Sequence, residues 1–276
     1  MEPRPGHRGN EPLARFPHPL SRWLISRYPR ATVRRPADID QGVNVMSDPS
    51  SRRSLDEPTL AFLRSVDSPT MANAIEPFEV RDRTSGFIGG AVECQFPELG
   101  VMVGRALTVT MTNGPGPVAS RDGYWRMWDA LDAAPSPSVL VIADASGAPN
   151  RCAYAGEMMA TLAQRLGAVG MVTDGALRDV DEVRAIGFHY FMRYPVVSHA
   201  NFEIVSVGEP VVLDGERVET GDLLHGDRNG IVVIPDAVLD GLPEAVQGIR
   251  EKERAQLEFM RGDDFTLAAL KQRSGY

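Results

Sequence analysis

Three residues in two short segments have the types and the spacing to do chemistry. Glu157 follows Gly156 and opens a helix in AYAGEMMATLAQRLG, and Arg178-Asp179 follow a strand in TDGALRDVDEV. An aspartate offers a hard oxygen ligand, and an arginine offers a permanent cation with a planar fork of donors. The N-terminus of a helix adds unpaired N–H groups that stabilise a carboxylate. Together these groups suit a reaction that builds negative charge on an oxygen beside a metal ion.

Each of these residues also has a purely structural explanation. Asp179 and Glu182 have the spacing of a capping box, which stabilises a helix start without any further function. Glu157 in the first turn of a helix would complement the helix dipole. Structural ion pairs also produce such arrangements, so only the combination of the three residues points to function.

The elements that must position these residues are those of an α/β domain over residues 54–276. Apolar runs predict buried strands at 138–145 and 169–175, and helices follow them at 157–166 and 180–186. This alternation favours parallel strands, so both turns should face one crevice at the carboxyl ends of the strands. The other predicted elements are helices at 58–67 and 68–76 (the second capped by Ser68), a strand at 101–112, a loop at 113–117, a helix at 122–134, antiparallel strands within 207–235 and a helix from Leu239 to about Met260.

The first 53 residues differ from the rest in composition. They hold ten arginines, five acidic residues and many prolines, with little apolar periodicity. Such a segment cannot bury enough apolar surface to order itself, so we predict a disordered tail over residues 1–53. Its arginine-rich, acid-poor beginning resembles a transit peptide. Met46 lies just before the predicted domain, and we favour the simpler interpretation that the chain as written begins too early.

Composition argues against several classes of function. The 276 residues carry a formal net charge of −8, which disfavours nucleic-acid binding through a broad basic field. No run approaches the ~20 apolar residues of a membrane helix. The only lysines, Lys252 and Lys271, lie in a charged C-terminal stretch, so Schiff-base chemistry is improbable. Histidine-ligated zinc is disfavoured because no histidines pair at ligand spacing, and we expect His189, His199 and His225 to be surface or turn residues.

The spacing of the three chemical residues resembles a family signature. Glu157, twenty intervening residues and Arg178-Asp179 resemble the acidic-X20-Arg-Asp motif of class II pyruvate aldolases related to 4-hydroxy-4-methyl-2-oxoglutarate aldolase. That family also contains the regulator of ribonuclease activity A, and its members were once labelled demethylmenaquinone methyltransferases. The blocks 104–109, 156–188 and 221–235 look like family blocks in family order. One departure is Glu157, because aldolases of proven type often have aspartate there.

The resemblance implies a role for each matching residue. Asp179 would be the direct carboxylate ligand of Mg²⁺ or Mn²⁺, and Glu157 would hold water molecules around the metal. Arg178 would contact the pyruvyl oxygen and stabilise the enolate. The backbone N–H groups of one turn would hold the pyruvyl carboxylate, namely those of Gly156, Glu157, Met158 and Met159.

The resemblance also implies a fold, an activity and an assembly. The fold would be an α/β/β/α sandwich with a mixed central β core in a single domain. The protein would cleave a 4-hydroxy-2-oxo acid to pyruvate through a metal-stabilised enolate, with oxaloacetate decarboxylation as a side activity. We expect a small 2-oxo acid substrate, no nucleic-acid or membrane partner, a cytoplasmic location, and a homotrimer or homohexamer with the site near a subunit interface.

Other interpretations compete with this one. The chain could be a non-catalytic regulator that binds a protein partner such as a ribonuclease, because a fold survives the loss of activity. A related lyase or hydratase would share the site and differ only in substrate. The methyltransferase label is rejected because ASGAPN, after the strand at 138–145, lacks the glycine-rich turn of such enzymes.

Some features near the motif have two interpretations. Asn150, Arg151 and Tyr154 precede the Gly156 turn and could contact the substrate or simply form a polar loop. The segment 81–99 could be a lid or a surface hairpin. The general base for the 4-hydroxyl cannot be identified from sequence, and a metal-bound water held by Glu157 is the candidate. Cys152 is expected to be an inert thiol.

Overall fold

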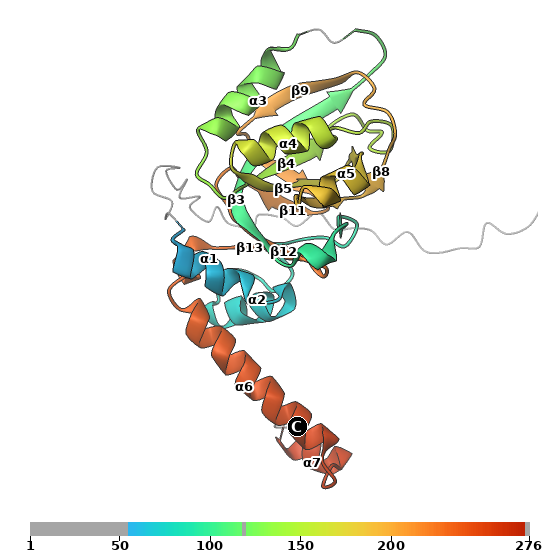
Figure 1. Cartoon of the computed structure of the whole chain (residues 1–276). Coiled ribbons are helices and arrows are strands. Elements are labelled where there is room, and N and C mark those ends of the chain that lie inside the picture. Colours follow the sequence, from blue (N-terminus) through green and yellow to red (C-terminus); the bar gives the residue numbers. More distant parts are fainter. Residues whose placement is uncertain (1–54, 118–119, 274–276) are drawn as a thin grey trace, which may run out of the picture. The chain divides into compact units, whose positions relative to one another are not determined.

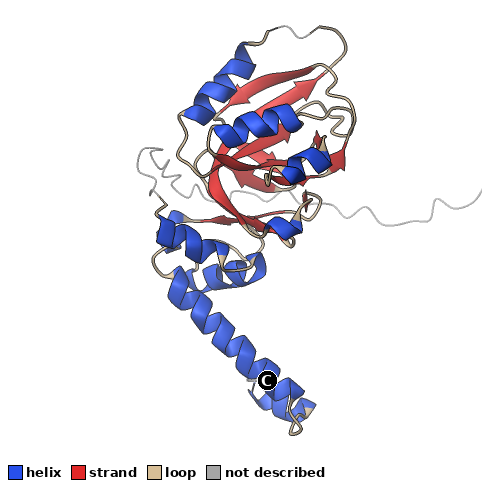
Figure 2. Ribbon diagram, viewed as in Figure 1, coloured by secondary structure: helices blue, strands red, loops and turns tan. Residues whose placement is uncertain are grey.

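The computed structural model describes residues 55–117 and 120–273 (Figure 1). The predicted disordered tail, residues 1–53, lies outside the described residues. Within the described ranges the chain is mixed α/β, with helices lying against a central sheet (Figure 2). None of the helices in these ranges combines the length and apolar character that crossing a membrane requires.

The central sheet is built around one long strand, β3 (Met102–Asn113). β3 pairs in parallel with β4 (Ser138–Asp144) and antiparallel with β12 (Leu223–Asp227), while its last residues pair with β9 (Phe202–Val207). The parallel run continues from β4 through β5 to β7, and the strands late in the chain are antiparallel, both as predicted. The strand order is β1-β13-β12-β3-β4-β5-β7-β2, in which the other strands are β1 (Phe87–Ile88), β13 (Gly230–Ile234), β5 (Ala168–Thr173), β7 (His189–Met192) and β2 (Glu93–Cys94).

The two ends of this sheet approach each other. β1 and β2 lie at opposite ends of the strand order, yet residues 89–92 alone connect them. Because each residue spans at most ~3.6 Å, the sheet must curl. The enclosed face is apolar, with Val92, Met102, Val141, Phe191 and Ile231 all buried. The segment 81–99 is therefore a closure of the sheet rather than a lid or a free hairpin.

Helices cover the two outer faces of the curled sheet (Figure 2). One group buries its apolar side against the parallel strands and consists of α3 (Asp122–Asp132), α4 (Glu157–Arg165) and α5 (Val180–Ala185). The other group shares a second core with β12, β13 and the start of β3, and consists of α1 (Glu57–Arg64), α2 (Ser68–Ile75) and α6 (Leu242–Arg261). Helix, sheet, sheet and helix thus follow one another, which confirms the predicted α/β/β/α arrangement.

The helix α2 is capped by Asp67, and the predicted Ser68 cap is wrong. The N-cap of α2 is Asp67, whose carboxylate accepts from the Thr70 N–H at 2.9 Å, and Ser68 is the first helical residue. The Ser68 hydroxyl instead lies 3.1 Å from Nδ1 of His225 in β12. Aspartate caps helices as well as serine does, so local sequence could not separate the two.

The C-terminal helix begins later than predicted. Residues Asp236–Val238 form a 3₁₀ turn, and α6 starts at Leu242 with Pro243 in its first turn, where a missing N–H is tolerated. Leu242 and Val246 pack against α2. α6 is followed by a further helix, α7 (Leu267–Arg273).

Candidate active site

Two segments that are distant in sequence run side by side at the carboxyl ends of the parallel strands. β6 (Ala176–Leu177) leads into Arg178 and Asp179, and it pairs with β8 (Tyr194–Pro195). Residues 153–156 lie against β6, because the Tyr154 N–H donates to Ala176 O at 2.9 Å and the Arg178 N–H donates to Ala155 O at 3.0 Å. This pairing brings the beginnings of α4 and α5 together, as the β-α-β-α pattern predicted.

Asp179 adopts an unusual backbone conformation that aims its carboxylate at α4. Its φ of 58° and ψ of 47° lie in the left-handed region, which is uncommon for residues other than glycine but tolerated by aspartate. Its side chain makes no capping bond to α5, so the capping-box explanation with Glu182 is wrong. Oδ2 instead accepts a hydrogen bond from the Glu157 N–H at 2.9 Å. The carboxylate therefore caps the neighbouring helix.

Gly156 makes this close approach possible. A Cβ at this position would collide with Asp179 Oδ2 and with the side chain of Arg178. Gly156 O accepts the first helical bond of α4, from the Ala160 N–H at 2.9 Å. The N–H groups of Met158 and Met159 precede that bond and have no partner within the helix. They are the donors that a bound carboxylate would meet.

Arg178 lies over the same turn. Its Nε is 3.6 Å from Asp179 Oδ2, and its Nη1 lies 3.5 Å from the carbonyl oxygen of Val197. Both side chains are 36% exposed, so neither ion is fully desolvated. A guanidinium held by an anion on one side and a carbonyl on the other still presents donors to a ligand.

A cavity of about 200 Å³, here called the inner cavity, opens at this point. Five of the six predicted site residues line it, namely Gly156, Met158, Met159, Arg178 and Asp179. The sixth, Glu157, does not line it, and its side chain is exposed. The structure thus brings the backbone of Glu157, rather than its carboxylate, into the site.

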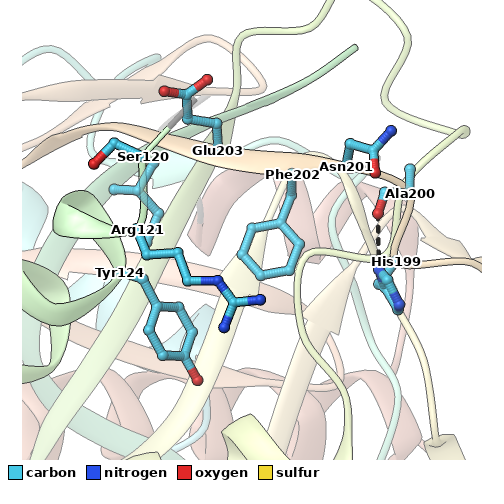
Figure 3. A pocket seen from close by; sticks show the side chains of 9 residues that line it. Ser120, Arg121, Tyr124, His199, Ala200, Asn201, Phe202 and Glu203 are labelled. Atoms are coloured by element: carbon cyan, nitrogen blue, oxygen red, sulfur yellow. Dashed lines mark hydrogen bonds between the residues drawn. The ribbon is translucent and has the colours of Figure 1, made fainter. Parts of the chain in front are cut away.

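Figure 3 shows a second cavity of about 370 Å³, here called the outer cavity. The two share His199 and Phe202 in their walls. Figure 3 shows the Arg121 guanidinium and the rings of Tyr124 and Phe202 facing the same space. Sequence reasoning missed these residues because they come from the start of α3 and from residues 199–204, and no motif links either segment to the signature.

Tyr154 links the wall of the inner cavity to the end of β4. Its hydroxyl donates to Asp144 Oδ1 at the end of β4, and burial, followed by this contact, raises the tyrosine pKa. The Asp144 N–H in turn donates to Asp174 Oδ1 at 2.8 Å, and burial raises the pKa of that carboxyl. Tyr154 lines the inner cavity, whereas Asn150 and Arg151 line neither cavity.

Cys152 is buried, and its thiol donates to His199 O at 3.1 Å. Burial raises its pKa to about 11. The thiolate is therefore scarce at neutral pH, which agrees with the inert thiol predicted from sequence.

Two of the histidines expected on the surface are buried, and that prediction was wrong. His189 in β7 is 8% exposed, and burial lowers its pKa to about 4. His225 is fully buried, with Nε2 3.0 Å from the carbonyl oxygens of Leu63 and Val66. Carbonyls only accept, so Nε2 carries the proton and Nδ1 can accept from the Ser68 hydroxyl. Both histidines belong to the packing of the domain rather than to the site.

The donor set at the inner cavity suits a hard cation that keeps most of its own ligands. In the part of the chain that the structure describes, no group of three or more histidine, cysteine or acidic side chains is placed to hold a metal. Asp179 Oδ2 accepts from the Glu157 N–H, so Oδ1 is the candidate ligand for a cation. Mg²⁺ often binds through one or two protein carboxylates together with waters and substrate oxygens, so a single aspartate fits it.

The part of the chain that carries this site matches a known protein family. The family model described as RraA-like, Aldolase/RraA, matches residues 68–233. A Halalkalibacterium halodurans protein named "Putative 4-hydroxy-4-methyl-2-oxoglutarate aldolase" is 32% identical over 135 residues, which are 49% of this chain and 60% of that protein. A Burkholderia mallei protein of the same name is 33% identical over 113 residues, 40% of this chain and 67% of that one. The match thus spans about three-fifths of the length of the Halalkalibacterium relative.

Solved structures share the fold. An uncharacterized protein from Pseudomonas syringae pv. tomato superposes with a TM-score of 0.63 at 24% identity, covering 84% of this chain and all of that one. Streptomyces coelicolor RraAS2, described as an unusual member of the RNase ES inhibitor RraA protein family, superposes with a TM-score of 0.58 at 22% identity, covering 75% of this chain and all of that one. At these identities the likeness establishes the fold alone.

Proposed function

The chain belongs to the RraA-like family, and on that premise we propose that it is a divalent-metal-dependent lyase that cleaves a 4-hydroxy-2-oxo acid to pyruvate. The observation that carries the proposal is the convergence of Asp179, Arg178 and the start of α4 on one small cavity. The presence of Glu157, Arg178 and Asp179 together favours an enzyme over a protein that only binds a partner. Relatives named as aldolases support the same class of reaction.

The residues of the inner cavity match the parts of a 2-oxo acid. The Met158 and Met159 N–H groups, together with the dipole of α4, would hold the carboxylate. The Arg178 guanidinium would donate to the 2-oxo oxygen and stabilise the enolate as its charge develops. Asp179 would hold Mg²⁺ or Mn²⁺. When bound, such an ion supplies Lewis acidity that polarises the 2-oxo group.

The role of Glu157 divides into two parts. Its N–H fixes the Asp179 carboxylate at 2.9 Å, a backbone role that any residue except proline could fill. Its carboxylate lies outside the cavity wall. We propose that it holds water molecules that bind the metal. This arrangement accommodates glutamate at a position where related aldolases often have aspartate.

We also propose that the chain assembles as a homotrimer or homohexamer with the site near a subunit interface. Trp125 on α3, 61% exposed, lies beside Tyr124 of the outer cavity and would be covered by a neighbouring subunit. Light scattering coupled to gel filtration measures the mass directly. A monomer at micromolar concentration would contradict this part of the proposal.

The test of the proposed function is pyruvate release. The protein is assayed with 4-hydroxy-4-methyl-2-oxoglutarate and with oxaloacetate, each with Mg²⁺, with Mn²⁺ and after chelation. We expect turnover that needs the metal and falls by roughly 10²–10³-fold in Arg178→Ala, as for the loss of one preorganised donor. Metal-independent or absent turnover, with Arg178→Ala equal to wild type, would favour a regulator that binds a ribonuclease or another protein.

A further inference from the structure

His199 lies at the boundary between the two cavities. With Phe202 it contributes to the walls of both the inner and the outer cavity. If the inner cavity holds the pyruvyl half of a substrate, the outer cavity holds the half that leaves. The bond that breaks then lies between them, beside His199. We propose, on the basis of the proposed function, that His199 is the catalytic base that removes the proton from the 4-hydroxyl.

The hydrogen bonding of the imidazole leaves the correct nitrogen available. His199 Nδ1 lies 2.7 Å from Ala200 O, a carbonyl that can only accept (Figure 3). Nδ1 therefore carries the proton in the neutral ring, and Nε2 has a free lone pair. A base needs that lone pair within reach of the substrate proton.

The loop that carries His199 is held firmly to the site. Ala200 has a φ of 41°, in the left-handed region, and its N–H donates to the Ser198 hydroxyl at 3.1 Å. Ser198 O accepts from the Ala153 N–H at 2.8 Å, and His199 O accepts from the Cys152 thiol. Residues 152–153, which lead to Gly156, thus also fix the backbone of His199.

Other ionisable side chains of the two cavities are less suited to this step. Arg121 and Arg178 stay protonated, so they cannot take a proton. The Tyr154 hydroxyl already donates to Asp144, and Asp179 Oδ2 accepts from the Glu157 N–H. Tyr124 lines only the outer cavity, and so does the Glu203 carboxylate. It is the alternative base that an experiment must separate from His199.

The 4-hydroxyl proton moves to His199 Nε2, and the electron pair of the O–H bond forms the C4 carbonyl. The electron pair of the C3–C4 bond moves to C2–C3, and the C2 oxygen takes the charge as pyruvate enolate. The aldehyde or ketone leaves. The enolate takes a proton from water at C3, and the imidazolium returns its proton to water.

The experiment compares two reactions of one active site. Decarboxylation of oxaloacetate forms the same enolate without removing a hydroxyl proton, so it does not need this base. We expect His199→Ala to lower kcat for cleavage of the hydroxy acid by about 10²–10⁴-fold and to lower decarboxylation far less. Added imidazole should restore part of the cleavage activity. Glu203→Gln, which changes the other candidate base, should lower kcat for cleavage far less than His199→Ala does.

The outcomes separate the two proposals. If wild type releases pyruvate from neither compound, the proposed function fails. If wild type cleaves the hydroxy acid but His199→Ala loses both reactions equally, or neither, the role of His199 is overturned. A selective loss in Glu203→Gln would also overturn it. A readout without metal or turnover is the ¹⁵N spectrum of the protein, in which a proton on Nε2 rather than Nδ1 of neutral His199 would contradict the proposed geometry.

Discussion

The Asp179 carboxylate accepts a hydrogen bond of 2.9 Å from the backbone N–H of Glu157, which lies 22 positions earlier in the chain. This bond joins the first turn of α4 to the residue that precedes α5. It also gives the spacing of the sequence signature a physical meaning. The acidic residue at the first position contributes its backbone to the site, while the aspartate at the second position contributes its side chain.

Replacing the Glu157 N–H should therefore matter more than replacing its carboxylate. Proline is tolerated at the first position of a helix, and the extended Gly156 before it (φ −146°, ψ −164°) suits a residue that precedes proline. We expect Glu157→Pro to lower Mn²⁺ affinity and kcat by more than Glu157→Gln, whose effect should be about tenfold, as for an outer partner of a metal site. Calorimetric titration measures the Mn²⁺ affinity of each variant, and the pyruvate-release assay measures kcat. Equal effects of the two substitutions would contradict the backbone role.

Removing the charge of Asp179 should abolish metal binding without unfolding the domain. In Asp179→Asn the amide oxygen can still accept from the Glu157 N–H, so the turn should persist. We expect Mn²⁺ affinity to fall below detection in calorimetry while the melting temperature changes little. Asp181→Asn is the matched control, because that carboxylate makes the same charge change nearby and is 91% exposed. Full metal affinity in Asp179→Asn would rule out Asp179 as the ligand.

Adding one methyl group at Gly156 should disturb the site. The new Cβ would collide with Asp179 Oδ2, and overpacking of this kind costs about 1–3 kcal/mol. We expect Gly156→Ala to lower the melting temperature by several degrees and pyruvate release at least tenfold. Gly90→Ala is the control, since a Cβ there would meet no atom of the described residues within 4 Å. If Gly156→Ala and Gly90→Ala change the melting temperature and pyruvate release equally, the contact between Gly156 and Asp179 is not tightly packed.

Acid should destabilise the domain through His189. Burial, assisted by the positive charge of Arg64, lowers its pKa from 6.5 to about 4, so the folded state binds fewer protons than the unfolded state. The stabilising effect of keeping His189 neutral is therefore complete above pH 6.5 and is lost as the pH falls toward 4. The full difference is about 3 kcal/mol.

Urea unfolding at pH 7 and at pH 4.5 measures this effect. His189→Gln, which cannot gain the proton, should lose less stability between the two pH values than wild type. His199→Gln serves as its control, because that ring is exposed. If wild type and His189→Gln show the same pH dependence, the buried ring is not the source of the acid sensitivity.

Local sequence determined the elements and the place of the signature residues in them. Apolar runs such as SVLVIAD predict strands because buried parallel strands need side chains that are apolar on both faces. The glycine before Glu157 and the Arg178-Asp179 pair follow strands in an alternating β-α pattern, so their position at one end of the sheet also followed from sequence. Five of the six predicted site residues line the inner cavity.

Only the tertiary structure decided how these groups meet. The left-handed backbone of Asp179 turns its carboxylate from its own helix to α4, and a capping-box spacing cannot reveal that choice. The burial of His189 depends on how the strands and helices pack around β7. The position of His199 depends on the backbone hydrogen bonds that hold residues 198–200 to residues 152–153. Spacing along a chain records local conformation, whereas contacts between distant segments are set by the packing of the whole core.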